Sequence, residues 1–120
     1  MRLLKNTWFN RFAKKEGITD AELREAAKLL EAGQADADLG GGVYKVRVAR
    51  SGEGKAGSYR VIVFFKSEER TFFAYGFAKS DIGNINEKQL RNFKLAAKTT
   101  FNYSDKEIDE RVRNGLFIEI

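Results

Sequence analysis

The spacing of apolar side chains predicts helices at both ends of the chain and strands in the middle. Residues 4–15 carry apolar side chains at intervals close to four, which is typical of an amphipathic helix, and Gly17 should end it. Thr19 and Glu22 have the spacing of a capping box, so a second helix should begin there and stop at Gly33. The apolar side chains of the first helix are Leu4, Trp8, Phe9 and Phe12.

The middle of the chain changes to a period of two, which is typical of strands. After a polar, glycine-rich linker at residues 36–42, the segment 43–48 alternates between apolar and basic positions. A predicted loop with three glycines, residues 51–57, separates it from residues 58–65, which are largely apolar on both faces and should form a covered central strand. A short polar turn then leads to an aromatic-rich strand at residues 71–77. Because the connections are short, we expect an antiparallel meander.

Two further capping boxes predict helices after the meander, Asn86 with Gln89 and Ser104 with Glu107. Residues 116–120 are apolar and should form either a final strand or a strap across the sheet. A chain of 120 residues has room for one domain. The predicted fold class is therefore α+β, with two N-terminal helices, a small antiparallel β-sheet meander and C-terminal helices.

The chain contains neither cysteine nor histidine. This composition excludes disulfides, thiolate metal sites and Ser-His-Asp or Cys-His catalysis. We expect no cofactor, although a carboxylate-bound magnesium ion stays open. The longest apolar stretch, Val61–Phe65, is far shorter than the roughly 20 residues that span a bilayer, and the N-terminus lacks a secretory hydrophobic region. We therefore expect a cytoplasmic protein with no membrane partner.

The excess of positive charge is concentrated in the strand-rich middle third. The net charge of the chain is +5, and the first and last forty residues each carry equal numbers of basic and acidic side chains. The whole excess thus lies in residues 41–80. A concentrated basic patch is typical of a surface that binds phosphates, and the alternative is a solvated sheet face that keeps the protein soluble.

The basic residues of the predicted strands should lie close together. Lys45 and Arg47 share one face of the first strand, Arg60 begins the second strand, and Lys79 follows the third. Adjacent strands are about 4.8 Å apart, so these like charges repel unless an anion neutralises them. A phosphodiester fits such a cluster, because arginine binds it with two hydrogen bonds and a lysine beside other cations can act as a general base.

The order of these segments resembles the core of the RelE family of toxins, and the HigB-like branch is the more similar. The resemblance rests on Tyr-Lys-Val-Arg-Val at residues 44–48, Lys-Ala-Gly-Ser-Tyr-Arg-Val-Ile at residues 55–62 and Tyr-Gly-Phe-Ala-Lys-Ser-Asp at residues 75–81. It covers residues 43–98, and the two preceding helices sit where the family has them. The chain is expected to be a single RelE-like toxin domain over residues 1–120.

This resemblance implies an activity and partners. RelE-like toxins enter the ribosomal A site and cut mRNA without a metal, by attack of a 2′-hydroxyl on the adjacent phosphorus. The products are a 2′,3′-cyclic phosphate and a 5′-hydroxyl. The expected partners are mRNA, the ribosome and a cognate antitoxin, and the HigB-like branch implies a helix-turn-helix antitoxin.

The resemblance also assigns catalytic roles to residues of this chain. Lys45 and Arg47 match two strand lysines that bind phosphate, one of which is the candidate general base. Arg60 matches the arginine that stabilises the phosphorane, and Lys79 lies near an arginine after the third strand. Some members use a tyrosine after that strand as an acid or base, but residues 80–100 contain none, so the general acid stays open.

Four further residues are expected to contact RNA: Arg50, Lys55, Tyr59 and Tyr75. The two tyrosines could equally belong to the core. Two alternatives to the ribonuclease also stay open. The first is a ParE-like toxin of the same fold that poisons DNA gyrase, which would not need a phosphate-binding face. The second is an RNA-binding module without catalysis.

Overall fold

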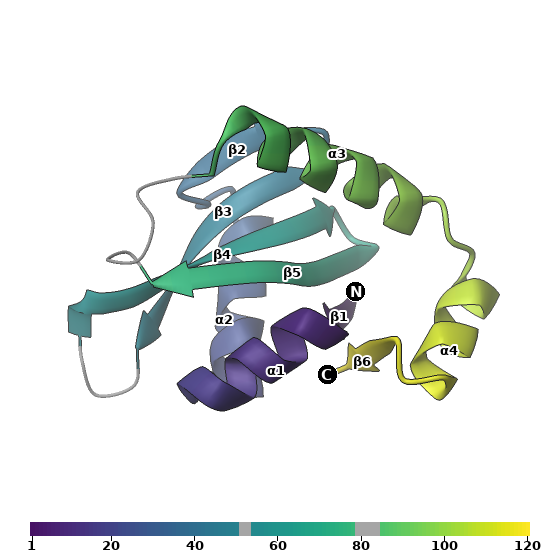
Figure 1. The fold of residues 1–120 in the computed structure, drawn as a ribbon, viewed down its shortest axis with the longest axis horizontal. Coiled ribbons are helices and arrows are strands. Elements are labelled where there is room, and N and C mark those ends of the chain that lie inside the picture. Colours follow the sequence, from purple (N-terminus) through teal and green to yellow (C-terminus); the bar gives the residue numbers. More distant parts are fainter. Residues whose placement is uncertain (51–53, 79–84) are drawn as a thin grey trace.

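The computed structural model describes residues 1–50, 54–78 and 85–120, which form four helices and one six-stranded sheet (Figure 1). The strands are β1 (Arg2–Asn6), β2 (Ala37–Gly40), β3 (Val43–Arg50), β4 (Gly54–Lys66), β5 (Arg70–Ala78) and β6 (Phe117–Glu119). The helices are α1 (Thr7–Glu16), α2 (Asp20–Glu31), α3 (Glu87–Phe101) and α4 (Asp105–Arg113).

The sheet has the strand order β2-β3-β4-β5-β1-β6. Its centre is the predicted antiparallel meander of β3, β4 and β5. As predicted, β4 lies inside the sheet, and its apolar side chains from Tyr59 to Phe65 pack on both faces. The sheet is nevertheless mixed, because β1 pairs with β5 in parallel and with β6 in antiparallel orientation.

The N-terminal strand corrects the predicted helix over residues 4–15. Leu4 belongs to β1, where it pairs with Phe72 of β5, and α1 begins only after Asn6. The Asn6 side chain accepts a hydrogen bond from the Phe9 N–H at 2.7 Å and so caps the helix. Leu4 and Trp8 are four positions apart, as in a helical repeat, but Leu4 is a fully buried residue of the strand β1.

Two predicted irregular segments are partly strand. Residues 37–40 of the predicted linker form β2 on the edge of the sheet. Gly40, Gly41 and Gly42 then turn the chain into β3 with positive φ angles, a conformation that glycine adopts readily. The predicted loop over residues 51–57 is too long, because β4 begins at Gly54. Residues 117–119 form the final strand β6, one of the two predicted alternatives.

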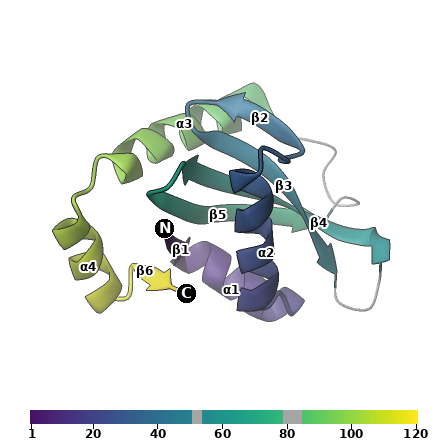
Figure 2. The same cartoon turned by 180° about the vertical axis from the view of Figure 1, so that it is seen from behind.

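Helices cover the two faces of the sheet separately (Figures 1 and 2). On one face, Phe9 of α1 and Leu23 of α2 pack with Val46 and Val61. On the other face, Ala97 of α3 and Ile108 of α4 belong to a cluster with Val43 and Ile62. The three predicted capping boxes, at the starts of α2, α3 and α4, are all confirmed.

Candidate functional site

Three basic side chains lie on one face of the central hairpin. Arg47 of β3 and Arg60 of β4 are directly opposite each other in the antiparallel register. Lys45 lies two residues before Arg47, opposite Ile62, and therefore on the same face. We call Lys45, Arg47 and Arg60 the basic cluster. The structure thus brings together three of the four predicted catalytic residues.

The members of the basic cluster differ in exposure. The Arg60 side chain is only 12% exposed, whereas the Arg47 side chain is 45% exposed. Arg60 Nη1 donates a hydrogen bond of 3.0 Å to Ser58 Oγ, which restricts the guanidinium group. Lys45 is half-buried, and within the described part of the chain no carboxylate lies at ion-pair distance from it. Among the described residues, Arg60 is therefore the most buried cation of the cluster, and Lys45 is the one without a carboxylate partner.

Asp36 completes the cluster and was not predicted from the sequence. Its Oδ2 atom lies 3.8 Å from Nε of Arg47 and 3.8 Å from Nε of Arg60. The Asp36 N–H donates a hydrogen bond of 2.9 Å to the Lys45 carbonyl, which fixes this residue beside β3. In the sequence, Asp36 belongs to a polar linker, and no local pattern connects it to the two arginines.

Aromatic side chains adjoin the basic cluster on β5. Phe77 is opposite Arg60 and Tyr75 is opposite Ile62, so both share the face of the cluster. The Tyr75 ring is half-buried and stacks on the Trp8 ring with a centroid distance of 4.4 Å. It also lies 5.7 Å from the Phe93 ring of α3. Tyr75 therefore belongs to an aromatic cluster at the border of the site.

Tyr59 lies on the opposite face of the sheet from the basic cluster. It is 1% exposed and packs in the core beneath α1. Its hydroxyl donates a hydrogen bond of 2.7 Å to Glu16 Oε1. In this position the phenol has no access to RNA bound at the basic cluster.

The remaining predicted site residues are not placed by the structure. Lys79 follows the end of β5 and lies outside the described residues. Arg50 and Lys55 belong to the backbones of β3 and β4, but their side chains also lie outside the described part of the structure.

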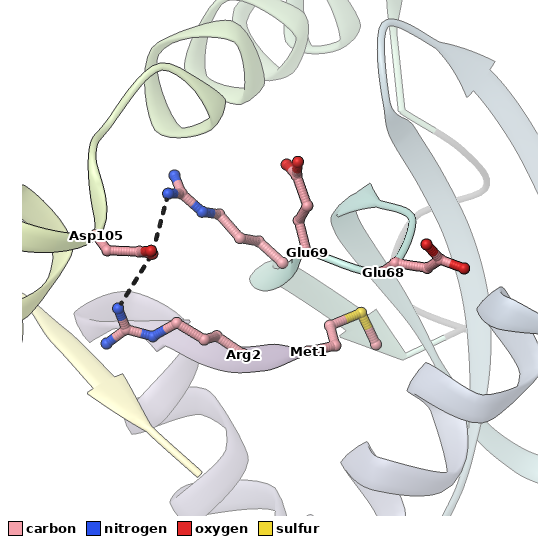
Figure 3. Close-up of a pocket in the computed structure, with 6 residues that line it drawn as sticks. Met1, Arg2, Glu68, Glu69 and Asp105 are labelled. Atoms are coloured by element: carbon pink, nitrogen blue, oxygen red, sulfur yellow. Dashed lines mark hydrogen bonds and ion pairs between the residues drawn. The ribbon is translucent and has the colours of Figure 1, made fainter.

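A second polar cluster ties the two ends of the chain together, and Figure 3 shows its ion pairs around Asp105. Arg2 donates hydrogen bonds to Glu119 and Asp109, and Asp105 forms ion pairs with both Arg2 and Arg70. We call these five residues the terminal ion-pair cluster. Some of them line a cavity of about 380 Å³ beside the β4–β5 turn. The hydrogen bonds that Arg2 donates to Glu119, and then to Asp109, raise the pKa of Arg2 above its ordinary value against the opposing effect of burial.

The terminal ion-pair cluster carries one more negative than positive charge, and its role is to stabilise the fold. Arg2 and Arg70 face three carboxylates, those of Asp105, Asp109 and Glu119. An anionic substrate would be repelled by these acids, so the cluster is a poor phosphate site. Its bonds connect β1 and β5 to α4 and β6, which holds the C-terminal elements against the sheet.

The described residues provide neither a membrane-spanning helix nor a cluster of metal ligands. No helix among them has the length and apolar character needed to cross a membrane. No three side chains of the carboxylate, histidine or cysteine type come together there as possible ligands of a metal ion.

The family is established by comparison with known proteins. The family model of the RelE toxin of the RelE/RelB toxin-antitoxin system matches residues 1–120, the whole of the chain. The match therefore includes the helices, the meander with its basic cluster, and the C-terminal elements. The chain belongs to the RelE toxin family.

Proposed function

We propose that this toxin is an mRNA endoribonuclease that acts in the A site of translating ribosomes, and that it is of the HigB-like type. The observation that carries the proposal is the facing pair Arg47 and Arg60, with Lys45 on the same sheet face. These side chains come from adjacent strands of a rigid sheet. A phosphodiester placed there would meet two guanidinium groups and the amino group of one lysine.

The chemistry of the basic cluster suits attack of a 2′-hydroxyl on phosphorus. Lys45 is the candidate general base, because its amine can accept a proton whereas a guanidinium stays charged. Arg60 would stabilise the extra negative charge of the pentavalent phosphorane, and Arg47 would bind a non-bridging oxygen. The 2′-oxygen forms a bond to phosphorus as the bond to the 5′-oxygen breaks.

Proton transfer and product chemistry complete the proposed step. The departing 5′-oxygen takes up a proton and becomes a 5′-hydroxyl, while the other product ends in a 2′,3′-cyclic phosphate. The described residues include Tyr75 as the only phenol that borders the basic cluster, but its ring is stacked on Trp8. The proposal therefore assigns no side chain as general acid.

The proposal includes partners and location. The toxin would bind mRNA and the ribosome in the cytoplasm, and a helix-turn-helix antitoxin would neutralise it. An antitoxin that presents carboxylates to the basic cluster would block access of RNA. The proposal of these partners is based on membership of the RelE toxin family and on the positive charge of the basic cluster.

The test is expression in bacteria with global mapping of RNA 5′ ends, comparing wild type, Arg60→Ala and the control Arg113→Ala. Arg113 is exposed at the end of α4 and far in the sequence from the basic cluster. We expect wild type and the control to arrest growth and to produce new cuts inside translated messages, and Arg60→Ala to do neither while remaining folded. Growth arrest with intact messages would contradict the proposal and favour a protein target such as gyrase.

A further inference from the structure

We propose that Asp36 is an internal substitute for the substrate phosphate. Its carboxylate holds Arg47 and Arg60 in the free protein and competes with RNA for them. The inference rests on the proposed function, because it takes the basic cluster as the site of the RNA phosphate. It adds a positioning residue to that site, contributed by the segment before β2.

The backbone places Asp36 at the edge of the sheet. Among the described residues, β2 pairs with β3 only from Val43 to Lys45, so the rest of β3 forms an edge there. Asp36 directly precedes β2, and its N–H is bonded to the Lys45 carbonyl at 2.9 Å. Its side chain can therefore reach the two arginines at the end of the paired region without belonging to the strand.

The geometry shows attraction without hydrogen bonding. A single oxygen, Oδ2, lies 3.8 Å from Nε of each arginine. A hydrogen bond between these atom types is about 2.7–3.2 Å long. Asp36 thus offsets part of the positive charge of the pair without a hydrogen bond, and its side chain is 32% exposed, so it can move aside into solvent.

The charges of Arg47 and Arg60 explain the role of Asp36 in the free protein. Two guanidinium groups on directly opposite strand positions repel each other. One carboxylate shared between them reduces this repulsion, and it carries the same single negative charge as a phosphodiester. A phosphate oxygen, however, can form charge-assisted hydrogen bonds of about 2.7–2.9 Å with both groups. Phosphate should therefore displace Asp36.

Two opposite effects follow from removing the charge of Asp36. The free protein should become less stable, because the repulsion between Arg47 and Arg60 is no longer reduced. RNA should bind more tightly, because the Asp36 carboxylate no longer competes for the same groups. A residue with a purely structural role would lower both stability and affinity when replaced.

The test compares Asp36→Asn with the matched control Asp38→Asn. Asp38 is an exposed residue of β2, and its Oδ1 accepts a hydrogen bond from the Gly40 N–H at 3.0 Å, which an asparagine oxygen can also accept. The probe is a single-stranded 2′-O-methyl RNA tetranucleotide, which cannot be cleaved because the attacking hydroxyl is blocked. Binding is measured by fluorescence anisotropy at an ionic strength of about 0.1 M, where the Debye length is about 10 Å, and the melting temperature is measured without RNA.

We expect Asp36→Asn to bind the oligonucleotide about three- to tenfold more tightly than wild type, the range that one or two part-exposed ion pairs provide. Asp38→Asn should stay within about twofold of wild type, because solvent screens the more distant charge. The melting temperature of Asp36→Asn should be below those of wild type and the control.

Four outcomes would overturn the inference, and they separate it from the proposed function. Unchanged or weaker binding by Asp36→Asn, with binding lost in Arg60→Ala, would refute the role of Asp36 and leave the RNA site intact. Equal gains in Asp36→Asn and Asp38→Asn would show an effect of net charge only. Equal binding by wild type and Arg60→Ala, or binding by none of the proteins, would refute the RNA site and the inference with it.

Discussion

Residues of the β3–β4 hairpin have different roles, which depend on the face of the sheet that their side chains occupy. Arg47 and Arg60 share one face, whereas Tyr59, next to Arg60 in the chain, is buried on the other. Because successive strand residues point to opposite faces, neighbours in sequence serve different parts of the molecule. The motif that contains Tyr59 and Arg60 therefore combines a core position with a site position.

Tyr59→Phe should separate stability from RNA cleavage. The replacement keeps the buried ring and removes the hydroxyl that donates to Glu16. We expect a loss of about 1.5–3 kcal/mol in the free energy of unfolding, the usual range for a hydrogen bond to a charged group. Chemical denaturation measures that loss, and cleavage on ribosomes should be unchanged. Reduced cleavage with unchanged stability would show that the phenol does contact RNA.

At the scale of elements, α1 and β5 are in unusually close contact. Gly76 of β5 faces α1, and a Cβ atom at this position would lie 2.4 Å from a ring carbon of Phe12. The Trp8 ring of the same helix stacks on Phe12 and Tyr75. The absence of a side chain at Gly76 thus lets the helix approach the strand that borders the basic cluster.

Gly76→Ala should therefore destabilise the protein by about 1–3 kcal/mol, as overpacking of a core does. Thermal unfolding measures the effect. The double variant Gly76→Ala with Phe12→Leu should be more stable than the sum of the two single effects predicts, because the smaller side chain relieves the clash. Strictly additive effects would contradict the proposed contact.

The stability of the first turn of α4 should depend on pH, because its capping box contains a carboxylate, that of Glu107. The backbone N–H of Ser104 donates a hydrogen bond to the Glu107 carboxylate, and the Ser104 hydroxyl has a smaller effect of the same sign. Both lower the pKa of Glu107 below its ordinary value of about 4.5. A lowered pKa in the folded state contributes stability that is complete above pH 4.5 and is lost as the pH falls through the lowered value. The capped carboxylate thus stabilises α4 at neutral pH and not in strong acid.

Glu107→Gln should accordingly have a lower melting temperature than wild type at pH 7, and this difference should disappear in strong acid. The control Glu110→Gln removes an exposed charge from the same helix without changing the cap. A difference between Glu107→Gln and wild type that is equal at both pH values would contradict the role of the charge.

At the scale of the whole molecule, the two ends of the chain complete the sheet together. β1 inserts between β5 and β6, and Arg2 binds Glu119 and Asp109 with hydrogen bonds of 2.8–2.9 Å. These contacts connect residues more than 100 positions apart in the sequence. The C-terminal elements α4 and β6 are therefore held in place by the first strand.

Arg2→Gln should loosen the C-terminal elements. We expect a loss of about 1–2 kcal/mol in the free energy of unfolding, since the hydrogen bonds involve charged groups but are partly exposed to solvent. Limited proteolysis should cut within residues 102–120 faster than in wild type. Arg113→Gln, which removes an exposed charge from α4, is the control. Equal proteolysis of all three proteins would contradict the role of Arg2.

The sequence predicted the features of the fold that depend on local patterns. The capping boxes and the meander follow from residues a few positions apart, and so do Lys45 and Arg47 on one face. Part of β1 was wrongly predicted to be helical, because it is a strand only through its pairing with β5, where Leu4 lies opposite Phe72, far along the chain. Asp36 was missed for the same reason, since β2 and β3 separate it in the sequence from Arg60, with which it forms an ion pair.

Cleavage of mRNA on purified translating ribosomes tests the central claim most directly. Wild type and Arg60→Ala are added to ribosomes stalled on a defined message, and the RNA ends are analysed chemically. We predict a cut in the A-site codon by wild type, with a 2′,3′-cyclic phosphate and a 5′-hydroxyl, and at least a hundredfold slower cutting by folded Arg60→Ala, roughly the loss expected when one group that stabilises transition-state charge is removed. Intact message with the wild-type protein, or equal cutting by both proteins, would contradict the assignment of the basic cluster as a ribonuclease site.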